Sequence, residues 1–296
     1  SKMAQFIRDV TPHEGVPPQI GDADDGFVSR FDPAWPNDPY VEVVEAEAAV
    51  TQKLTNNQLS QKAFFYSLIA GVTQLNKKDV SLRPKFPRIY KESGYGILGD
   101  HNYRVVFDAG SLGYPSIAAH GHADALSFCF AIKGKWWLVD PGTYSYHTDI
   151  KWRDYFRSTR AHNTVEVDGE NQSKIGGPFL WLSHAHAELS HYSETEADCQ
   201  WIEGYHDGYK QLGISHRRRI ELNLSEKKLT LIDSILGTGS HNVAIYFHFA
   251  PDLQLTKNKS NGKWTAFLVE NSDSLSMLLD SKLTWVVNQG ADAPIS

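Results

Sequence analysis

Two apolar runs lie close together in the segment SFCFAIKGKWWLV, residues 127–139. The first run covers residues 127–132 and the second covers residues 136–139, with only Lys133-Gly134-Lys135 between them. Aromatic and β-branched residues are common in strands, and a glycine between polar residues is typical of the turn that joins two strands. The segment therefore predicts two short strands with a turn between them.

The same kind of sequence continues on both sides of this segment. Further short runs that contain β-branched or aromatic residues occupy residues 103–107, 162–167, 218–224, 229–232 and 244–249. Turn signals such as Asp168-Gly169 separate them. Many short strands at this spacing predict a mainly β fold, an antiparallel β-sandwich. We expect this domain to cover residues 89–296.

Residues 1–88 have a different pattern. The first forty residues concentrate Pro, Gly and Asp, which predicts turns rather than regular structure. Residues 41–50 are rich in Ala and Glu, and apolar residues recur at helical spacing within residues 58–75, so two helices are predicted. Two helices and a long loop are too little for a free-standing domain. We expect residues 1–88 to be the last helices of an incomplete α/α toroid.

Length and charge exclude several classes of protein. The chain has 296 residues, with 29 basic and 35 acidic side chains and a net charge of −6, which argues against a general nucleic-acid-binding surface. No apolar run approaches the roughly 18 residues of a membrane span, and no signal peptide is visible. Cys129 and Cys199 are too few for a disulfide scaffold; one disulfide or two buried thiols fit them equally well.

Acidic residues gather in the segment GDADDG, residues 21–26. Asp22, Asp24 and Gly26 have the spacing of a calcium-binding loop. However, Pro33 occupies the position at which that loop needs its bidentate glutamate. We therefore expect an acidic turn without calcium.

Two histidines flank a glycine in His120-Gly121-His122, just ahead of the run at residues 127–132. Side chains alternate in extended backbone, so both imidazoles are expected on one face. Asp140 follows the run at residues 136–139, and His162 begins another run. Two imidazoles and one carboxylate from separate segments are a common zinc arrangement with a fourth position open to water. The plain alternative is a set of histidines that only form hydrogen bonds.

Three arginines follow in the sequence as Arg153, Arg157 and Arg160. If this segment is helical, they share one face. That face is either a solvated basic surface or a clamp for carboxylates or sulfates.

Tyrosines are interspersed with these cationic groups at Tyr144, Tyr146 and Tyr155. Tyrosines are usually packing residues. Beside cations, however, the pKa of a tyrosine hydroxyl can fall, which suits a general acid or base.

Other features have weaker functional interpretations. His184-x-His186 is a rival metal pair, but no comparable carboxylate accompanies it. In a strand, only alternate residues of Arg217-Arg218-Arg219 share a face, so this run is expected to be mostly structural. Isolated tryptophans can stack on sugars but are more often core residues. They are Trp181, Trp201 and Trp264.

The sequence resembles the heparinase II/III-like family of polysaccharide lyases through three motifs in the family's order. They are HGHADALSF at residues 120–128, DPGTY at residues 140–144 and RSTRAHNTVEVDGENQS at residues 157–173. The resemblance is specific over about residues 95–173, and the segment at residues 21–26 extends it more weakly. Such proteins pair an α/α toroid with an antiparallel β-sandwich and cleave acidic polysaccharides by β-elimination.

The resemblance implies that His122, Asp140 and His162 hold a structural zinc ion. It also implies that His120 points into the cleft and helps to neutralise the uronate carboxylate, after which a base takes the C5 proton and an acid protonates the leaving O4. The family's principal tyrosine, and its asparagine or histidine, belong to the toroid and are not found in this chain. The candidates on the sandwich side are Tyr144, Tyr146 and Tyr155.

We therefore expect a polysaccharide lyase acting on an acidic, uronate-containing polymer such as a glycosaminoglycan or alginate. By resemblance we expect it in the periplasm or secreted, with this chain a fragment that is inactive alone. One alternative is a zinc-dependent hydrolase, whose products lack the C4=C5 double bond. Another is a non-catalytic polysaccharide-binding or assembly protein on the same scaffold. The sequence leaves the oligomeric state open.

Overall fold

The computed structural model describes residues 2–23, 68–71, 85–114, 116–257, 264–268, 273–288 and 290. The helix predicted at residues 41–50 lies outside these residues. Of the helix predicted at residues 58–75, only residues 68–71 are described, and residues 68 and 69 are helical. The toroid part of the prediction therefore lies largely outside the described residues.

The first sheet contains five antiparallel strands in the order β1-β2-β3-β4-β5. Their bounds are Arg88–Tyr90, Tyr95–Gly99, Tyr103–Asp108, Phe128–Ile132 and Lys135–Leu138. The β4–β5 hairpin turns at Lys133 and Gly134, whose φ angles are 48° and 83°. Two positive φ angles in a two-residue loop are typical of a type I′ turn, which matches the twist of the strands it joins. The two runs of residues 127–139 thus form a hairpin.

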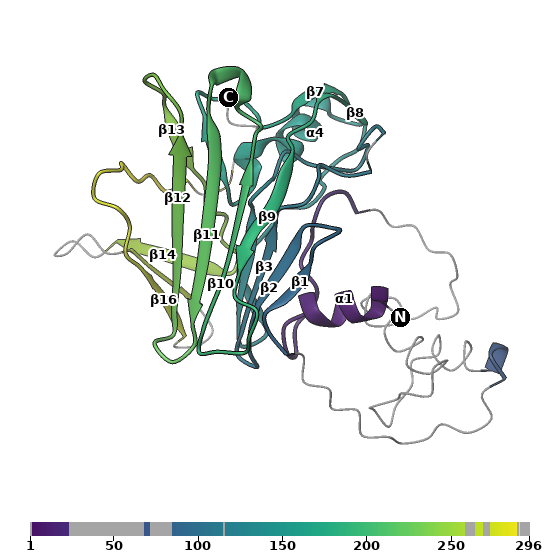
Figure 1. Ribbon diagram of the computed structural model, residues 1–296, viewed down its shortest axis with the longest axis vertical. Helices are drawn as coiled ribbons and strands as arrows, with labels where there is room; N and C mark the ends of the chain where they lie inside the picture. The colour runs from purple at the N-terminus through teal and green to yellow at the C-terminus, as the bar shows by residue number, and fades with distance from the viewer. Residues whose placement is uncertain are drawn as a thin grey trace.

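The second sheet contains four strands in the order β12-β11-β10-β9. Their bounds, from β9 to β12, are Ala187–Tyr192, Cys199–His206, Ser215–Asn223 and Lys228–Leu236. Buried and more exposed residues alternate along β10 and β11, as expected when one face of a sheet meets a core. Figure 1 shows this sheet layered against β1, β2 and β3.

An apolar core lies between the two sheets. The first sheet contributes fully buried side chains such as Leu98, Phe107 and Phe128, and the second contributes Ile202 and Ile220. Removing these two inner faces from water is the main favourable term that holds such layers together. The prediction of a mainly β, antiparallel sandwich is confirmed.

Shorter elements surround the sandwich. A third sheet packs near Trp137 and contains β14 (Leu253–Lys257), β15 (Trp264–Leu268) and β16 (Ser274–Met277). Two strand pairs add β6 (Val165–Val167) with β13 (Val243–Ile245) and β7 (Lys174–Gly177) with β8 (Leu180–Ser183). The helix α4 (Ile150–Arg157) precedes a 3-10 turn at Thr159–Ala161, and a second such turn covers Lys210–Leu212. In Figure 1, α4, β7 and β8 lie together at one end of the molecule.

The prediction of turns throughout the first forty residues is wrong for Lys2–Val10, which forms the helix α1. The Pro and Gly residues behind that prediction begin only at Pro12. Val10 is buried and packs with Phe86 and Ile97 against the first sheet; Figure 1 shows α1 beside β1. Tertiary contacts therefore hold a helix that is too short to be stable by itself.

The first strand begins at Arg88, next to the boundary predicted between residues 88 and 89. The division into two domains stays a prediction, because the helices on which it rests lie outside the described residues. Among the helices that are described, none combines the length and the apolar character that crossing a membrane requires.

Candidate active site

Three loops bring the predicted metal ligands together. His122 lies ahead of β4, Asp140 follows β5, and His162 leads from the 3-10 turn into β6. One ligand atom from each side chain lies within 4.8 Å of the other two, and all three residues are buried. The side chains selected from the sequence thus form one cluster.

The hydrogen bonds of this cluster leave one nitrogen of each imidazole free. His162 Nδ1 bonds Asp140 Oδ2 at 2.8 Å, and His122 Nε2 bonds Asp22 Oδ1 at 2.8 Å. Within the described part of the chain, the buried atoms His122 Nδ1 and His162 Nε2 have no hydrogen-bond partner. Leaving a buried polar atom unpaired costs free energy. Two such nitrogens beside a carboxylate are the donor set that a transition-metal ion such as zinc uses, so these residues fit a metal ion.

Burial and neighbouring charges set the protonation of the cluster. Burial lowers the pKa of His122, which favours the neutral imidazole that binds metals. Burial also acts to lower the pKa of His162, but the Asp140 carboxylate outweighs it and raises that pKa. At Asp140 the effect of burial is outweighed by His162, so the pKa of Asp140 is lowered and the carboxyl is ionised.

A tight turn orients the Asp140 carboxylate. The Gly142 N–H donates to Asp140 Oδ1 at 2.9 Å, and Gly142 adopts a left-handed φ of 63°. Such a φ is easily adopted only by glycine. The sequence Asp140-Pro-Gly142 thus fixes one carboxylate oxygen in the turn and directs the other toward His162.

Asp22 is a central residue of the site that the sequence analysis interpreted only as part of an acidic turn. Its carboxylate bonds His122 Nε2 at 2.8 Å, His120 Nδ1 at 3.2 Å and Arg153 Nη2 at 2.6 Å, and it also bonds Arg153 Nη1. The Thr143 hydroxyl donates to it at 3.1 Å. Burial acts to raise the pKa of Asp22, but its bonds to His122 and Arg153 outweigh this and hold the pKa well below its usual range. Asp22 is therefore ionised, and its carboxylate holds His120, His122 and Arg153 in place.

The signal that could have identified Asp22 was the resemblance of residues 21–26 to a family segment. The other positions weighed for the calcium-binding loop, Asp24, Gly26 and Pro33, lie outside the described residues.

His120 lies at the surface beside the buried cluster. Its side chain is 67% exposed, and Asp22 holds its Nδ1. The Tyr146 ring packs edge-on to it at 6.3 Å, and Phe179 packs edge-on at 6.1 Å. The Tyr146 hydroxyl donates to the carbonyl of Ala23 at 3.0 Å. Tyr146 is thus placed next to His120.

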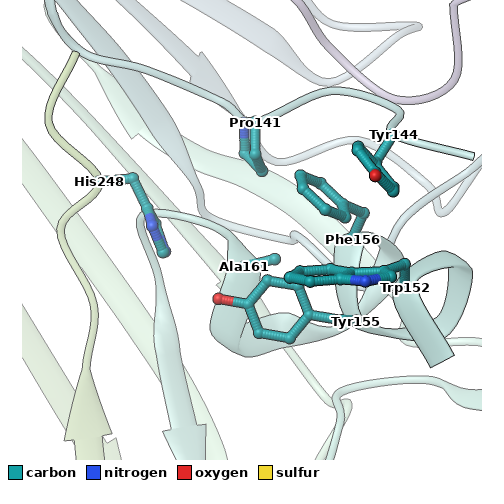
Figure 2. A pocket seen from close by; sticks show the side chains of 7 residues that line it. All are labelled: Pro141, Tyr144, Trp152, Tyr155, Phe156, Ala161 and His248. Atoms are coloured by element: carbon teal, nitrogen blue, oxygen red, sulfur yellow. The ribbon is translucent and has the colours of Figure 1, made fainter. Parts of the chain in front are cut away.

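Tyr144 lies in a separate aromatic pocket. Its ring stacks on Phe156 at 5.5 Å and contacts Trp152 at 5.4 Å. The pocket has a volume of ≈ 520 Å³. Figure 2 shows its lining residues, which are Pro141, Tyr144, Trp152, Tyr155, Phe156, Ala161 and His248. The catalytic role predicted for Tyr144, like those for Tyr146 and His120, stays a prediction.

The expectation of a lowered tyrosine pKa is wrong for Tyr155. Burial raises the pKa of this hydroxyl, and the positive charge of Arg160 counters the shift only in part. The desolvation of the phenolate outweighs the attraction of a single neighbouring cation.

The expected shared face of the three arginines is wrong for Arg160, because α4 ends at Arg157. Arg153 is fully buried and bonds Asp22 and the Pro178 carbonyl. Arg157 is also fully buried; it donates to the Gly177 and Pro178 carbonyls.

Arg160 lies on the 3-10 turn and pairs with Glu166 at 3.0 Å. Arg153 and Arg157 thus bind protein groups inside the fold, while Arg160 is directed to a different element. A role in substrate binding stays a prediction for all three.

The rival basic and histidine features take structural or surface positions. His184 and His186 are exposed, and among the described residues the only group that could hold a metal is His122, Asp140 and His162. Of the run Arg217–Arg219, Arg218 is fully buried and bonds both oxygens of Asp233 at 2.7 and 3.0 Å. The expectation that this run is mostly structural is confirmed for Arg218.

The tryptophans and cysteines also have definite environments. Trp181 is buried beneath the guanidinium of Arg157, and Arg219 lies over the ring of Trp201. The side chain of Trp264 lies outside what the structure describes. Both cysteines are free thiols, Cys129 buried and Cys199 exposed, so no disulfide joins them.

Solved structures with a similar fold include two lyases. One is a heparinase III with methylated lysines, the BT4657 gene product, which has a TM-score of 0.61 and a sequence identity of 16%. The match covers 90% of this chain and 37% of the chain of that structure. The heparan sulfate lyase HepC from Pedobacter heparinus has a TM-score of 0.59 and 18% identity, over 91% of this chain and 38% of its own. At such identities the likeness concerns the fold alone. The chain spans less than two fifths of the length of either structure.

No curated protein is similar enough to match the sequence. The family model described as "Heparinase II/III-like, C-terminal" matches residues 83–296, which is more than half of the chain. The chain therefore belongs to the heparinase II/III-like family, through its C-terminal domain.

Proposed function

We propose that this chain is part of a polysaccharide lyase that cleaves an acidic, uronate-containing polymer by β-elimination. The observation that carries the proposal is the position of His120, exposed at the surface and held by Asp22 beside the buried cluster of His122, Asp140 and His162. Membership of the heparinase II/III-like family supports it. Glycosaminoglycans and alginate both fit the proposed substrate class, and a periplasmic or secreted location follows from the same proposal.

The chemistry assigns separate tasks to the residues. The proton at C5 of a uronate is barely acidic until the adjacent carboxylate is neutralised. We assign this neutralisation to His120, whose Nδ1 is held by Asp22 and whose ring is exposed. A base then takes the C5 proton, the C5 electrons form the C4=C5 double bond, and an acid protonates the departing O4. Two tyrosines are candidates for these proton transfers. Tyr146 is the better placed of the two, because it lies next to His120, and Tyr144 is the second candidate.

We further propose that His122, Asp140 and His162 hold a zinc ion. The support is their donor set and the two buried nitrogens that lack hydrogen-bond partners. When bound, zinc would supply a structural tie between three loops and a fixed positive charge. We assign it no step of the elimination.

Metal content of the purified chain tests the zinc proposal. We expect near-stoichiometric zinc in the parent chain and loss of the metal in His122→Ala and Asp140→Ala. His184→Ala removes an exposed histidine outside the cluster and is the matched control, which should retain the metal. A folded parent chain that stays metal-free after zinc is added would contradict the proposal.

The lyase proposal extends beyond this chain, which spans less than two fifths of the solved lyases to which it is similar. We propose that the chain alone carries only part of the active site and is inactive. The activity test therefore uses the product of the complete reading frame, offered heparin, heparan sulfate, hyaluronan, alginate and bacterial exopolysaccharides.

An ultraviolet-absorbing unsaturated uronate from at least one polymer is the expected product. His120→Ala should abolish it, and His184→Ala should leave it unchanged. Cleavage that yields no double bond would instead indicate a hydrolase. Tight binding without any cleavage would indicate a polysaccharide-binding protein on the same scaffold.

A further inference from the structure

The aromatic pocket shown in Figure 2 is distinct from the buried metal cluster but adjoins it in the chain. Pro141 directly follows the ligand Asp140, and Ala161 directly precedes the ligand His162. The pocket volume of ≈ 520 Å³ lies within the range of about 300–1,000 Å³ that is usual for small-molecule sites. None of the roles assigned above, apart from the candidate role of Tyr144, accounts for this pocket.

The lining of the pocket combines aromatic faces with polar edges. Tyr144, Trp152, Tyr155 and Phe156 contribute four aromatic rings, and Tyr144 is 65% exposed. Within the described residues, no hydrogen bond occupies the hydroxyls of Tyr144 and Tyr155 or the indole N–H of Trp152. An apolar face with donors at its edge is what a pyranose ring needs, because its C–H groups pack on the aromatic ring while its hydroxyls bond the edge groups.

The lining carries no formal charge. None of its residues is Asp, Glu, Lys or Arg. The single titratable side chain besides the tyrosines is His248, whose Nε2 bonds the carbonyl of Arg160 at 3.0 Å. Burial lowers the pKa of His248 to about 4, so its imidazole is neutral at physiological pH. None of the lining side chains is a cation that could pair with a carboxylate or sulfate, and burying such a group without a partner is costly.

We propose that this pocket binds an uncharged pyranose residue of the polysaccharide, stacked on Trp152 and Tyr144, while a charged uronate is engaged at His120. This inference rests on the proposed function, because it assigns the second sugar to the same polymer. Tyr146 packs edge-on to His120, and Tyr144, two residues earlier in the chain, lines the pocket. The site therefore selects a polymer in which charged and uncharged sugars alternate or are mixed.

Binding of neutral and acidic disaccharides to the purified chain tests this inference. The probes are cellobiose and N,N′-diacetylchitobiose, both neutral, and digalacturonic acid, which is anionic. Saturation-transfer NMR detects contact, and titration gives the dissociation constant. We expect at least one neutral disaccharide to bind and the acidic one to bind at least tenfold more weakly. Trp152→Ala and Tyr144→Ala should each raise the dissociation constant of the neutral disaccharide roughly tenfold, as expected for the loss of one stacking ring.

Controls separate binding from folding. Tyr144 is largely exposed, so Tyr144→Ala should keep the fold even if Trp152→Ala does not. Trp201→Ala removes a tryptophan that packs with Arg219 on the second sheet and should leave the affinity unchanged. Trp152→Phe retains an aromatic face and should recover most of the affinity.

The outcomes distinguish this inference from the lyase proposal. Failure of both neutral disaccharides to bind, or tighter binding of digalacturonic acid that Tyr144→Ala abolishes, would overturn the pocket assignment even if the complete protein is a lyase. Pocket binding that depends on Tyr144 and Trp152 would support the assignment even if no polymer is cleaved, because this assay requires no turnover.

Discussion

A single carboxylate, that of Asp22, joins the N-terminal segment to the candidate active site. It bonds the exposed His120, the buried His122 and both terminal nitrogens of Arg153. The Arg153 side chain is fully buried, so its positive charge depends on this partner. Asp22 thus supports both the orientation of His120 and the stability of the loops around it.

Asp22→Asn tests this role. The substitution keeps the shape of the side chain but removes the charge that Arg153 needs. We expect the free energy of unfolding in urea to fall by about 3–5 kcal/mol, the usual effect of removing one partner from a buried ion pair.

Asp168→Asn is the matched control, because Asp168 makes a more accessible pair with His241. An equal loss of stability in both variants would contradict a special role for Asp22.

The sequence revealed the three residues of the buried cluster but not their support. His122, Asp140 and His162 were recognisable because their side-chain types and their positions next to apolar runs point to one chemistry. The role of Asp22 was not, because its contacts span about a hundred residues or more, and only the weaker resemblance of residues 21–26 to a family segment pointed to it. For Arg153, helical spacing indicates which residues share a face, but it does not tell whether solvent or protein covers that face.

At the scale of elements, a polar network ties the strands of the second sheet together inside the protein. His206 on β10 lies opposite His216 on β11, and their nitrogens Nε2 and Nδ1 lie 3.1 Å apart. His216 Nε2 bonds Asp233 on β12 at 2.7 Å. Burial lowers the pKa of both histidines, His206 most strongly, so both are neutral in the folded protein at pH 7.

This network predicts a loss of stability in mild acid. Below the ordinary histidine pKa of about 6.5, the unfolded chain takes up a proton that folded His216 does not. The free energy of unfolding therefore falls as the pH falls, by up to about 1.4 kcal/mol per pH unit for one histidine. We expect His216→Gln, which can keep both hydrogen bonds, to reduce this slope. Urea unfolding at pH 7, 6 and 5 measures this change of the free energy of unfolding with pH.

His241→Gln provides a control of opposite sign. The hydrogen bond that His241 donates to the Asp168 carboxylate raises the pKa of His241, so this group stabilises the fold at low pH and loses that effect as the pH rises. Its removal should make the acid slope steeper. A slope unchanged in His216→Gln would contradict the predicted role of His216.

Strands with apolar inward faces were predictable, but strands with polar inward faces were not. β4 reads as a nearly continuous apolar run because both of its faces are covered. The inward face of β10 instead carries Gln200 and His206, both buried. Gln200 bonds the backbone of Gly99 in the other layer, at 2.8 and 3.0 Å. Such residues break the alternation of apolar and polar side chains that identifies a strand, and only tertiary contacts explain them.

For the whole molecule, the shared core makes the two sheets one cooperative unit. Ile202 of β10 is fully buried against residues of β2, β3 and β4, so neither layer keeps its inner face out of water without the other. Unfolding should therefore be a single transition, with far-ultraviolet circular dichroism and tryptophan fluorescence giving the same midpoint.

Ile202→Ala and Ile232→Ala test this coupling with the same substitution in two environments. Ile202 lies in the shared core, whereas Ile232 on β12 is 46% exposed. For Ile202→Ala we expect the free energy of unfolding to fall by about 2–5 kcal/mol, because apolar burial is lost and a cavity is left. The midpoints reported by the two probes should shift together. For Ile232→Ala the free energy of unfolding should fall by less than about 1 kcal/mol. If Ile202→Ala instead separated the two probes into two transitions, the layers would be independent units, because removing a core side chain would have destabilised one layer and left the other folded.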